Sequence, residues 1–310
     1  MSRLAYPLAV GTAAATFLLI LAGGLVTNTG AGLAVPDWPT TFGHNMFLFP
    51  WSQMVGGVFY EHSHRLLGAL VGLLTVALAG ALWPAGGALR WLGLVAVAAV
   101  VGQGVLGGLR VVLLAEALAI LHGCLAQAFF GLMAAIAFLT SAAARPGTAP
   151  IEPPLKALAF AAAALVYLQI VFGALLTHAG RLDLHLAGAA LVFVFVPIVT
   201  ARLRRTGDRV AGPVSRVVVG LLGLQLLLGV GSFLARFSSL ALPGGQTTIL
   251  VLPVAHRVAG SLLLAAAVIL AVRATTVSGA LYAVSSAGSA RAILPGGGPE
   301  GGRRGPLRVR

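Results

Sequence analysis

The stretch Tyr60-Glu-His-Ser-His-Arg-Leu-Leu-Gly68 stands directly before the apolar run Ala69–Leu82. It places a carboxylate, two imidazoles and a guanidinium where a hydrophobic helix begins. Charged groups at a membrane boundary are costly unless they are paired, hydrated or used. Glu61, His64 and Arg65 are three and four residues apart, so they share one face of a helix. These three residues therefore form the first hypothesis for a functional site.

The whole chain has the composition of a membrane protein. Its 310 residues are 59% hydrophobic and only 9% charged, with a mean hydropathy of +1.00, which is too apolar for a soluble protein. Runs of about 19 apolar residues are long enough for a helix to cross the ~30 Å hydrocarbon core. We expect an all-α polytopic membrane protein with eight transmembrane helices, at Pro7–Thr27, Tyr60–Leu82, Trp91–Leu109, Leu118–Thr140, Leu155–Thr177, Leu184–Leu203, Val214–Ala235 and Pro253–Val272.

The net charge of +13 indicates membrane topology rather than binding to nucleic acid. With a cytoplasmic N-terminus, only five of the 20 Lys and Arg residues lie outside, namely Arg65, Arg110, Arg181, Arg236 and Arg257. The positive-inside rule then places both termini in the cytoplasm. We expect a multi-pass protein of the cell membrane, in contact with lipid and without a nucleic-acid partner.

The second half of the chain repeats the first. Gln225-Leu-Leu-Leu-Gly229 matches Gln103-Gly-Val-Leu-Gly107, and Gln169–Gly173 matches Leu19–Gly23. Four spans in each half give halves of the same orientation, related by a pseudo-two-fold axis along the membrane normal. We expect two tandem four-helix bundles, residues 1–143 and 155–274, joined by a cytoplasmic linker, 144–154, and followed by a disordered cytoplasmic tail, 275–310.

Four histidines stand near the start of the even-numbered spans: His64, His122, His185 and His256. Even spans run from outside to inside, so all four lie at a similar depth near the outer face, whereas His62 points elsewhere. Two histidines per half favour metal ligation over four hydrogen-bonded core residues. A structural zinc site would be incomplete in the second half, whereas haem iron needs only two imidazoles.

Nearby glycines and arginines suit the same interpretation. Five glycines lie near the histidines: Gly68, Gly107, Gly123, Gly188 and Gly229. They would either let a flat macrocycle approach the helices or permit close packing of one helix on another. The candidate partners for haem propionates are Arg65, Arg110, Arg236 and Arg257. Arg181, beside Asp183, is better explained by snorkelling at the interface.

The two halves differ at one position. Glu61 stands one turn before His64, and Leu182 takes the corresponding place before His185. A carboxylate beside a haem can move protons or stabilise developing positive charge. We therefore assign substrate chemistry to the first half and a resident haem to the second.

The first outer loop, Asn28–Gly57, contains no Lys or Arg and is rich in Pro, Trp and Phe. Such a segment suits the membrane interface, either as a folded cap that shapes a site or as a simple interfacial loop. The residues alone leave these two interpretations open.

The motifs Glu61-His-Ser-His64-Arg65, His122-Gly-Cys-Leu-Ala-Gln127, Leu184-His185 and Ala255-His256-Arg257, on eight spans in two repeats, resemble the haem A synthase family of cytochrome oxidase assembly. The loop from Gly32 to Gly43 also looks like the family's first outer loop.

The resemblance implies oxidation of the C8 methyl group of haem O to a formyl group, with haem b as a cofactor. Haem b would be held by His185 and His256, and the substrate haem by His64 and His122, with Glu61 catalytic. It also implies a farnesyltransferase that supplies haem O, while the electron donor stays unidentified. Some members carry a cysteine pair in this loop; here Val35 and Thr41 occupy those places and Cys124 is the only cysteine, so thiol chemistry in the loop is excluded.

Two other functions compete with this one. A di-haem b-type protein resembling cytochrome b would pass electrons from a quinol without altering either haem. A transporter with parallel repeats would use the histidines as a proton relay. The sequence leaves the oligomeric state open, a homo-oligomer included.

Overall fold

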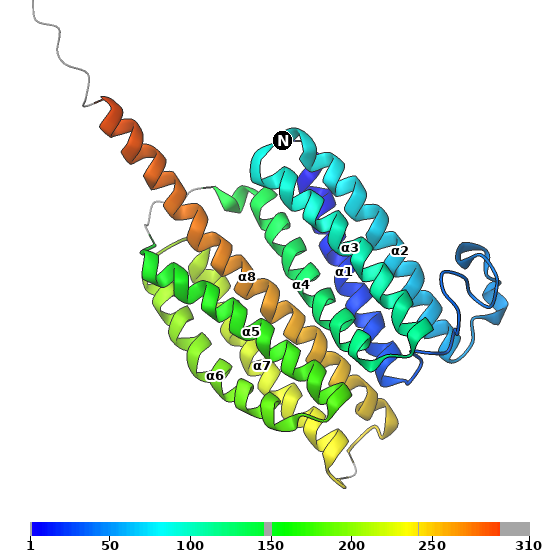
Figure 1. The fold of residues 1–310 in the computed structure, drawn as a ribbon. Coiled ribbons are helices and arrows are strands. Elements are labelled where there is room, and N and C mark those ends of the chain that lie inside the picture. Colours follow the sequence, from blue (N-terminus) through cyan, green and yellow to red (C-terminus); the bar gives the residue numbers. More distant parts are fainter. Residues whose placement is uncertain (1, 146–150, 241, 292–310) are drawn as a thin grey trace, which may run out of the picture.

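The computed structural model describes residues 2–145, 151–240 and 242–291, with side chains up to residue 276, and this part of the chain is all-helical (Figure 1). Its long helices are α1 (Ala5–Asn28), α2 (Gly57–Leu82), α3 (Gly87–Leu113), α4 (Glu116–Thr140), α5 (Pro153–Ala179), α6 (Leu182–Arg205), α7 (Ala211–Phe237) and α8 (Gln246–Arg291). Short 3₁₀ turns are η1 (Met46–Leu48), η2 (Trp51–Gln53), η3 (Trp83–Ala85) and η4 (Ala142–Ala144). All eight long helices are long and apolar enough to cross a membrane, as predicted.

Proline and glycine set the helix ends. Helix α5 starts with Pro153 in its first turn, where a missing N–H costs nothing. It ends at Gly180, whose φ of +67° is the left-handed conformation that glycine adopts without strain. Such caps extend the helices a few residues beyond the hydrophobic runs that predict them.

The helices associate in two groups of four. Helix α1 contacts α2 and α4, and α3 lies between α2 and α4; α5, α6, α7 and α8 contact one another in the same cyclic order. Helix α8 also lies against α1 and α4, and α4 contacts α5, so α8 stands between the groups (Figure 1).

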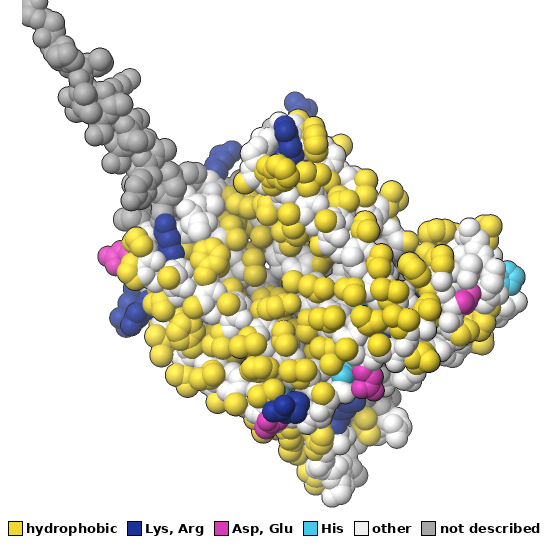
Figure 2. Space-filling model, in the orientation of Figure 1, with side chains coloured by type: hydrophobic (Ala, Val, Ile, Leu, Met, Phe, Trp, Pro, Cys, Tyr) yellow, Lys and Arg dark blue, Asp and Glu magenta, His cyan; other side chains and the backbone are white. Residues whose placement is uncertain are grey.

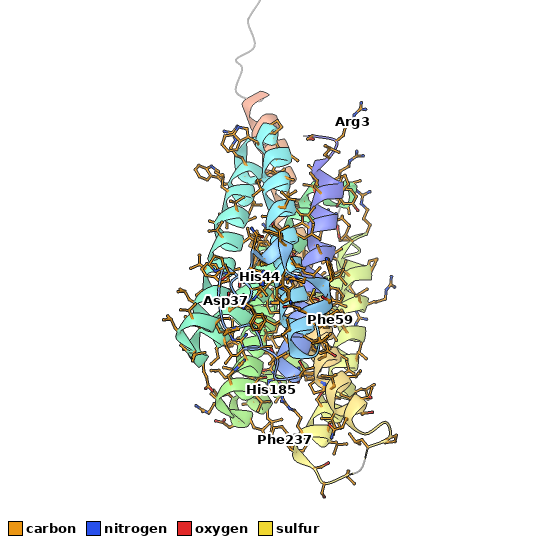
Figure 3. All side chains as sticks on the ribbon, turned by 90° about the vertical axis from the view of Figure 1, so that its right-hand side faces the viewer. Arg3, Asp37, His44, Phe59, His185 and Phe237 are labelled. Atoms are coloured by element: carbon orange, nitrogen blue, oxygen red, sulfur yellow. The ribbon has the colours of Figure 1, made fainter. Side chains whose placement is uncertain are left out.

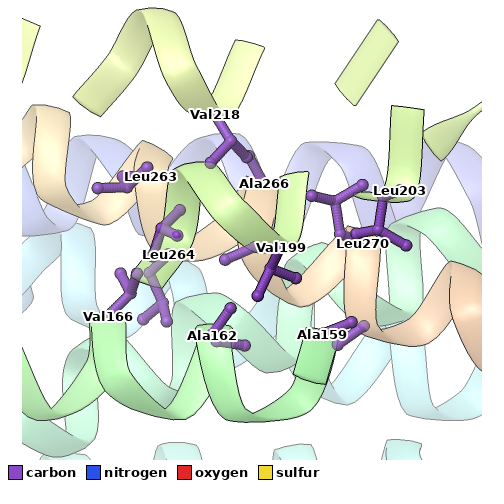
Figure 4. Close-up of a cluster of buried hydrophobic side chains, with 14 of the residues drawn as sticks. Ala159, Ala162, Val166, Val199, Leu203, Val218, Leu263, Leu264, Ala266 and Leu270 are labelled. Carbon is purple, nitrogen blue, oxygen red and sulfur yellow. The ribbon is translucent and has the colours of Figure 1, made fainter. Parts of the chain in front are cut away.

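Each group encloses its own core of small and branched side chains. In the first group, Ala9, Val71, Ala96 and Met133 come one from each helix. In the second, the corresponding residues include Ala159, Val199, Val218 and Leu264 (Figure 4). A smaller cluster joins the groups, with Ile20 on α1, Phe130 and Ala134 on α4, and Ala265 on α8.

The outer surface of the bundle is apolar. In Figure 2 hydrophobic side chains cover the middle of the visible face, and Lys, Arg, Asp and Glu gather towards its edges. Leu73, Val194 and Leu227 are among the large side chains exposed on the helices. A lipid-facing surface explains this exposure, since hydrocarbon solvates such side chains as well as a protein core does.

Helix α8 differs from the prediction at both ends. It begins at Gln246, before Pro253, and it continues to Arg291. Residues 275–291, expected to belong to a disordered tail, are therefore helical, and residues 292–310 of that expectation lie outside the described residues. No proline stands between Pro253 and Pro295, so nothing in the backbone chemistry forces the helix to stop at the end of the apolar run.

A buried ion pair closes the end of the bundle that carries the linker. Arg273 of α8 is fully buried; its Nε donates to Oδ1 of Asp208 (3.0 Å) and its Nη2 to Oδ2 (2.8 Å). Its Nη1 donates to the main-chain carbonyls of Ala143 (3.1 Å) and Arg145 (2.7 Å). Arg273 thus ties the α6–α7 connection and the end of the first half to α8. By the positive-inside rule, Arg273 counts only as one of the basic residues on the cytoplasmic side.

The Asp208 carboxylate is stabilised in return. Burial by itself raises the pKa of Asp208, but hydrogen bonds from Arg273 and from the main-chain N–H groups of Ala211 and Val210 lower it below the ordinary value. The pair therefore stabilises the fold above the ordinary Asp pKa and loses its contribution only as pH falls through the lowered value.

We predict that Asp208→Asn lowers the free energy of unfolding by about 3–5 kcal/mol, because it leaves the Arg273 charge buried without a counter-ion. Unfolding in SDS, followed by circular dichroism, measures this loss. Asp183→Asn, which breaks an exposed pair with Arg181, serves as the control and leaves the transition unchanged. An unchanged transition in Asp208→Asn would show that the pair does not hold the helices together.

Candidate functional site

The four histidines predicted as ligands each pack against a glycine on the preceding helix. A methyl group added to that glycine would lie 3.0 Å from Cε1 of His64 at Gly23, 3.2 Å from His122 at Gly107, 3.5 Å from His185 at Gly173 and 3.2 Å from His256 at Gly229. Most of these distances are shorter than ordinary van der Waals contact, so a larger residue would displace the imidazole. Each helix pair, α1–α2, α3–α4, α5–α6 and α7–α8, thus repeats one arrangement.

This arrangement changes the interpretation of several glycines. Gly107 and Gly229, expected to face a macrocycle or a helix, make room for histidine rings, and Gly188 makes room for Gln169 and Phe172. Gly68 and Gly123 have no atom within 4 Å of an added Cβ. Only these last two remain open to a bulky group.

Three of the four glycines that contact histidine rings, Gly107, Gly173 and Gly229, have a glutamine one turn before them. Nε2 of Gln103 donates to the main-chain carbonyl of His122 (3.2 Å). Gln169 and Gln225 do the same to His185 (2.9 Å) and His256 (3.0 Å). Gln169 Nε2 also lies 3.2 Å from Nδ1 of His185.

The histidines of the second half face each other. The ring centroids of His185 and His256 are 6.1 Å apart, with the ring planes at 76°. Two metal–imidazole bonds of about 2.0 Å, together with the two ring radii, separate ring centres by about 6 Å. The pair therefore fits a single iron between two imidazoles. Figure 3 shows His185 towards the end of the bundle that carries Phe237, far from Arg3.

In the first half, His64 and His122 pack against Gly23 and Gly107 in the same way, and both are half-buried. Nδ1 of His64, of His122 and of His256 is buried without a hydrogen-bond partner in the described part of the chain. Within the same residues, no group of three or more His, Cys, Asp or Glu side chains is placed to hold a metal ion.

Glu61 and Arg65 lie under the first outer loop. Glu61 is only 4% exposed; its Oε2 accepts from the main-chain N–H of Val35 (2.9 Å) and its Oε1 from Nη2 of Arg65 (2.9 Å). Arg65 also donates to the carbonyls of Val35 (3.0 Å), Asp37 (2.7 Å) and Thr40 (3.0 Å). The pair fixes the Glu61 carboxylate in place and holds the loop against α2. These partners use four of the five N–H donors of the Arg65 guanidinium.

The rest of the loop is folded as well. His62, which sequence reasoning set aside, is buried, with Nδ1 3.1 Å from Oγ1 of Thr41 and its ring 5.1 Å from that of Phe49. Trp38 covers Gly108 of α3. Residues 29–56 thus form an ordered cap over the start of α2 and the end of α3. The cap is visible beside these helices in Figure 1. His62 lies on a different face of α2 from His64, and nothing in the sequence pattern indicates that it packs under the cap.

Two of the predicted propionate partners have unpaired guanidinium groups. Arg110 packs on Gly32 of the cap, and Arg257 reaches Gly24 of α1. Within the described residues, neither guanidinium forms an ion pair or hydrogen bond. Arg236 is exposed and acts electrostatically on Arg257, and Arg181 instead pairs with Asp183 (2.7 Å). Unpaired, partly buried cations are open to an anionic ligand.

These observations define a class of protein. It is a polytopic membrane protein with two histidines in each of two groups of helices. The chain belongs to the cytochrome oxidase assembly protein family COX15-CtaA, which it matches over residues 6–295. It is also similar to a protein named "Heme A synthase" from Shouchella clausii (strain KSM-K16), with 35% identity over 109 residues. This match covers 34% of the chain and 35% of that relative, about a third of its length. The predicted resemblance to the haem A synthase family is confirmed.

We predict that Arg65→Gln releases the cap, because the four hydrogen bonds of the guanidinium are lost together. Limited proteolysis in detergent should then cleave within residues 29–56 at least tenfold faster than in the wild type. Arg236→Gln, at an exposed arginine, is the matched control and should cleave at the wild-type rate. Equal rates in both variants would mean that Arg65 does not hold the cap.

The cap should also respond to acid through Asp37. Burial raises the pKa of Asp37, but hydrogen bonds from the main chain of Gly43 and Phe42 and from the Thr40 hydroxyl lower it from 3.8 to about 2. Its contribution is complete above about pH 4 and is lost as pH falls towards 2. We expect the fluorescence of Trp38 to change between pH 4 and pH 2, and Asp37→Asn to show the acid spectrum already at pH 5. A Trp38→Phe variant identifies the signal, and a spectrum of Asp37→Asn identical to the wild type at pH 5 would contradict the prediction.

Proposed function

We propose that this protein is a haem A synthase, which oxidises the C8 methyl group of haem O to a formyl group in two successive steps with oxygen and electrons from outside. Membership of the cytochrome oxidase assembly family supports this function. The observation that carries it is the buried Glu61, fixed by two hydrogen bonds one turn from His64, with only Leu182 at the matching place in the second half.

In this proposal the first half, residues 1–143, holds the substrate and the second, residues 155–274, holds haem b, with the linker 144–154 between them. His64 and His122 bind haem O, and His185 and His256 bind haem b, whose bound iron supplies one-electron redox chemistry. Glu61 stabilises positive charge that develops near the methyl group or accepts a proton released there. Arg110 and Arg257 pair with propionates, supported by their unpaired guanidinium groups.

The proposed topology follows from the same arrangement. The cyclic contacts of α1–α4 and of α5–α8 support two bundles related by a pseudo-two-fold axis along the membrane normal. The basic residues favour cytoplasmic termini in the cell membrane, with the haem sites near the outer face. A farnesyltransferase that supplies haem O and an outside electron donor are the partners that this reaction needs.

Pyridine haemochrome analysis tests the proposal. Protein purified from cells that also make haem O should contain haem b and haem A. The formyl group of haem A shifts the haemochrome spectrum, so the two haems can be told apart. Haem b alone, under these conditions, would overturn the synthase and favour a di-haem electron-transfer protein.

We predict that Glu61→Gln and Glu61→Ala keep haem b but stop the formation of haem A. The Gln variant preserves the size of the side chain and an oxygen that can accept from Arg65, so it separates the carboxylate's chemistry from its support of the cap. His185→Ala and His256→Ala should lose haem b. Loss of haem b in Glu61→Gln, or retained low-spin haem b in both histidine variants, would show that the resident haem is assigned to the wrong half.

A further inference from the structure

The interior of each half is closed two turns beyond its histidines. In α2, Val71 stands seven residues after His64 and is only 1% exposed, whereas Gly68, between them, is half-buried. The residues seven after the other three histidines are buried as well, namely Phe129, Val192 and Leu263. A group held between two histidines would therefore rest on a closed core, and the residues one turn from each histidine would line its inner edge.

On the odd-numbered helices, one residue at this level breaks the pattern. Four residues before the glycine that faces each histidine stand Gln103 in α3, Gln169 in α5 and Gln225 in α7, but Leu19 in α1. The partly buried Leu19 packs on the core of the first half, so it faces the same interior as the glutamines do. The first half is therefore apolar at the one place where the other three helix pairs carry an amide.

On the even-numbered helices, the residue four after each histidine is small: Gly68, Ala126, Ala189 and Gly260. A Cβ added to Gly260 would lie 2.7 Å from Nε2 of Gln225, so the glutamine fills that space. No atom lies within 4 Å of a Cβ added to Gly68. Leu19 and Gly68 thus form a place that is both apolar and open, and we call these two residues the α1–α2 corner.

The matching place in the second half is polar and filled. Nε2 of Gln169 donates to the main-chain carbonyl of His185 (2.9 Å) and lies 3.2 Å from Nδ1 of the same residue. Oε1 of Gln169 fills the space beside Gly188 and is buried without a hydrogen-bond partner in the described part of the chain. An alkyl chain placed here would bury the amide against hydrocarbon, which costs free energy. The second half therefore disfavours a long alkyl substituent where the first half has room for one.

Resting on the proposed function, we propose that the α1–α2 corner binds the isoprenoid chain of haem O and thereby selects the substrate haem for the first half. The chain that the farnesyltransferase adds is what distinguishes haem O from haem b, and two imidazoles would ligate the iron of either haem. Selection therefore needs a contact away from the iron. Leu19 supplies an apolar wall and Gly68 supplies space, whereas Gln169 keeps the chain out of the resident site.

Haem extraction tests this assignment without measuring turnover. The protein is purified from cells that make haem O, and the extracted haems are separated by chromatography and counted per chain as prenylated haem, haem O plus haem A, and haem b. Gly68→Leu fills the corner with a side chain about the size of one isoprene unit. We expect it to lower the content of prenylated haem at least tenfold, because an apolar pocket discriminates strongly by size, and to retain haem b.

The matched control is Gly80→Leu. Gly80 is an exposed glycine of the same helix, and a Cβ added there also has no atom within 4 Å. This variant should contain as much prenylated haem and haem b as the wild type.

A second variant changes the polarity of the corner instead of its size, and it decides the matter if Gly68→Leu fails to fold. Leu19→Gln introduces the amide that the other three helix pairs carry, and it should also lower the content of prenylated haem at least tenfold with haem b retained. Leu18→Gln places the same amide on an exposed position of α1 and should match the wild type.

The inference is overturned if Gly68→Leu or Leu19→Gln contains as much prenylated haem as the wild type, or if the two controls lose it to the same extent. A wild type without prenylated haem, purified from cells that make haem O, would refute the proposed function and this inference with it. A wild type that contains haem O but never haem A would refute the proposed oxidation and leave the assignment of the corner standing. The haem extract therefore distinguishes these failures.

Discussion

An imidazole inside a membrane bundle needs space on the neighbouring helix, and in this protein glycine provides it four times. The contacts of Gly23, Gly107, Gly173 and Gly229 with histidine rings set how closely each helix pair approaches and which way each ring faces. A side chain at Gly23, Gly107 or Gly229 would press on the ring, whereas Gly173 leaves ordinary contact distance to His185, and helix backbones cannot move apart without disturbing the cores on either side. The glycine–histidine contact is thus the unit from which both halves are built, and the opposed pair of His185 and His256 follows from two such units.

Two arginines, the half-buried Arg65 and the fully buried Arg273, hold the connections at opposite ends of this framework. Burying a charge is costly, and in each case the cost is offset because nearly every guanidinium N–H has an acceptor. Arg65 combines Glu61 with carbonyls of the outer cap, whereas Arg273 combines Asp208 with the carbonyls of Ala143, at the end of the first half, and Arg145, in the linker. The connections are therefore ordered where they meet the helix ends, while the lipid-facing surfaces need no such contacts.

Against this shared framework the two halves differ in a consistent direction. In the second half, glutamine side chains donate to the main-chain carbonyls of both histidines, and the position one turn before His185 is Leu182. The first half has Glu61 beside His64 and Leu19 in place of a glutamine. Both differences fall on the helix pair α1–α2, and the outer cap, which is hydrogen-bonded to Glu61 and Arg65, covers the start of α2 and the end of α3.

The sequence by itself determined the eight spans, the four histidines near the starts of the even spans, the asymmetry of Glu61 and the family, because hydrophobic run length and helical spacing are local properties. It did not reveal the roles of His62 and Arg273, the length of α8 or the purpose of Gly107. Those depend on partners far along the chain: Arg273 meets Asp208 across 65 residues. Many of these partners are main-chain carbonyls, which every residue carries, so no pattern of side chains in the sequence can predict them. Only the tertiary structure could decide which carbonyl each arginine and glutamine would meet.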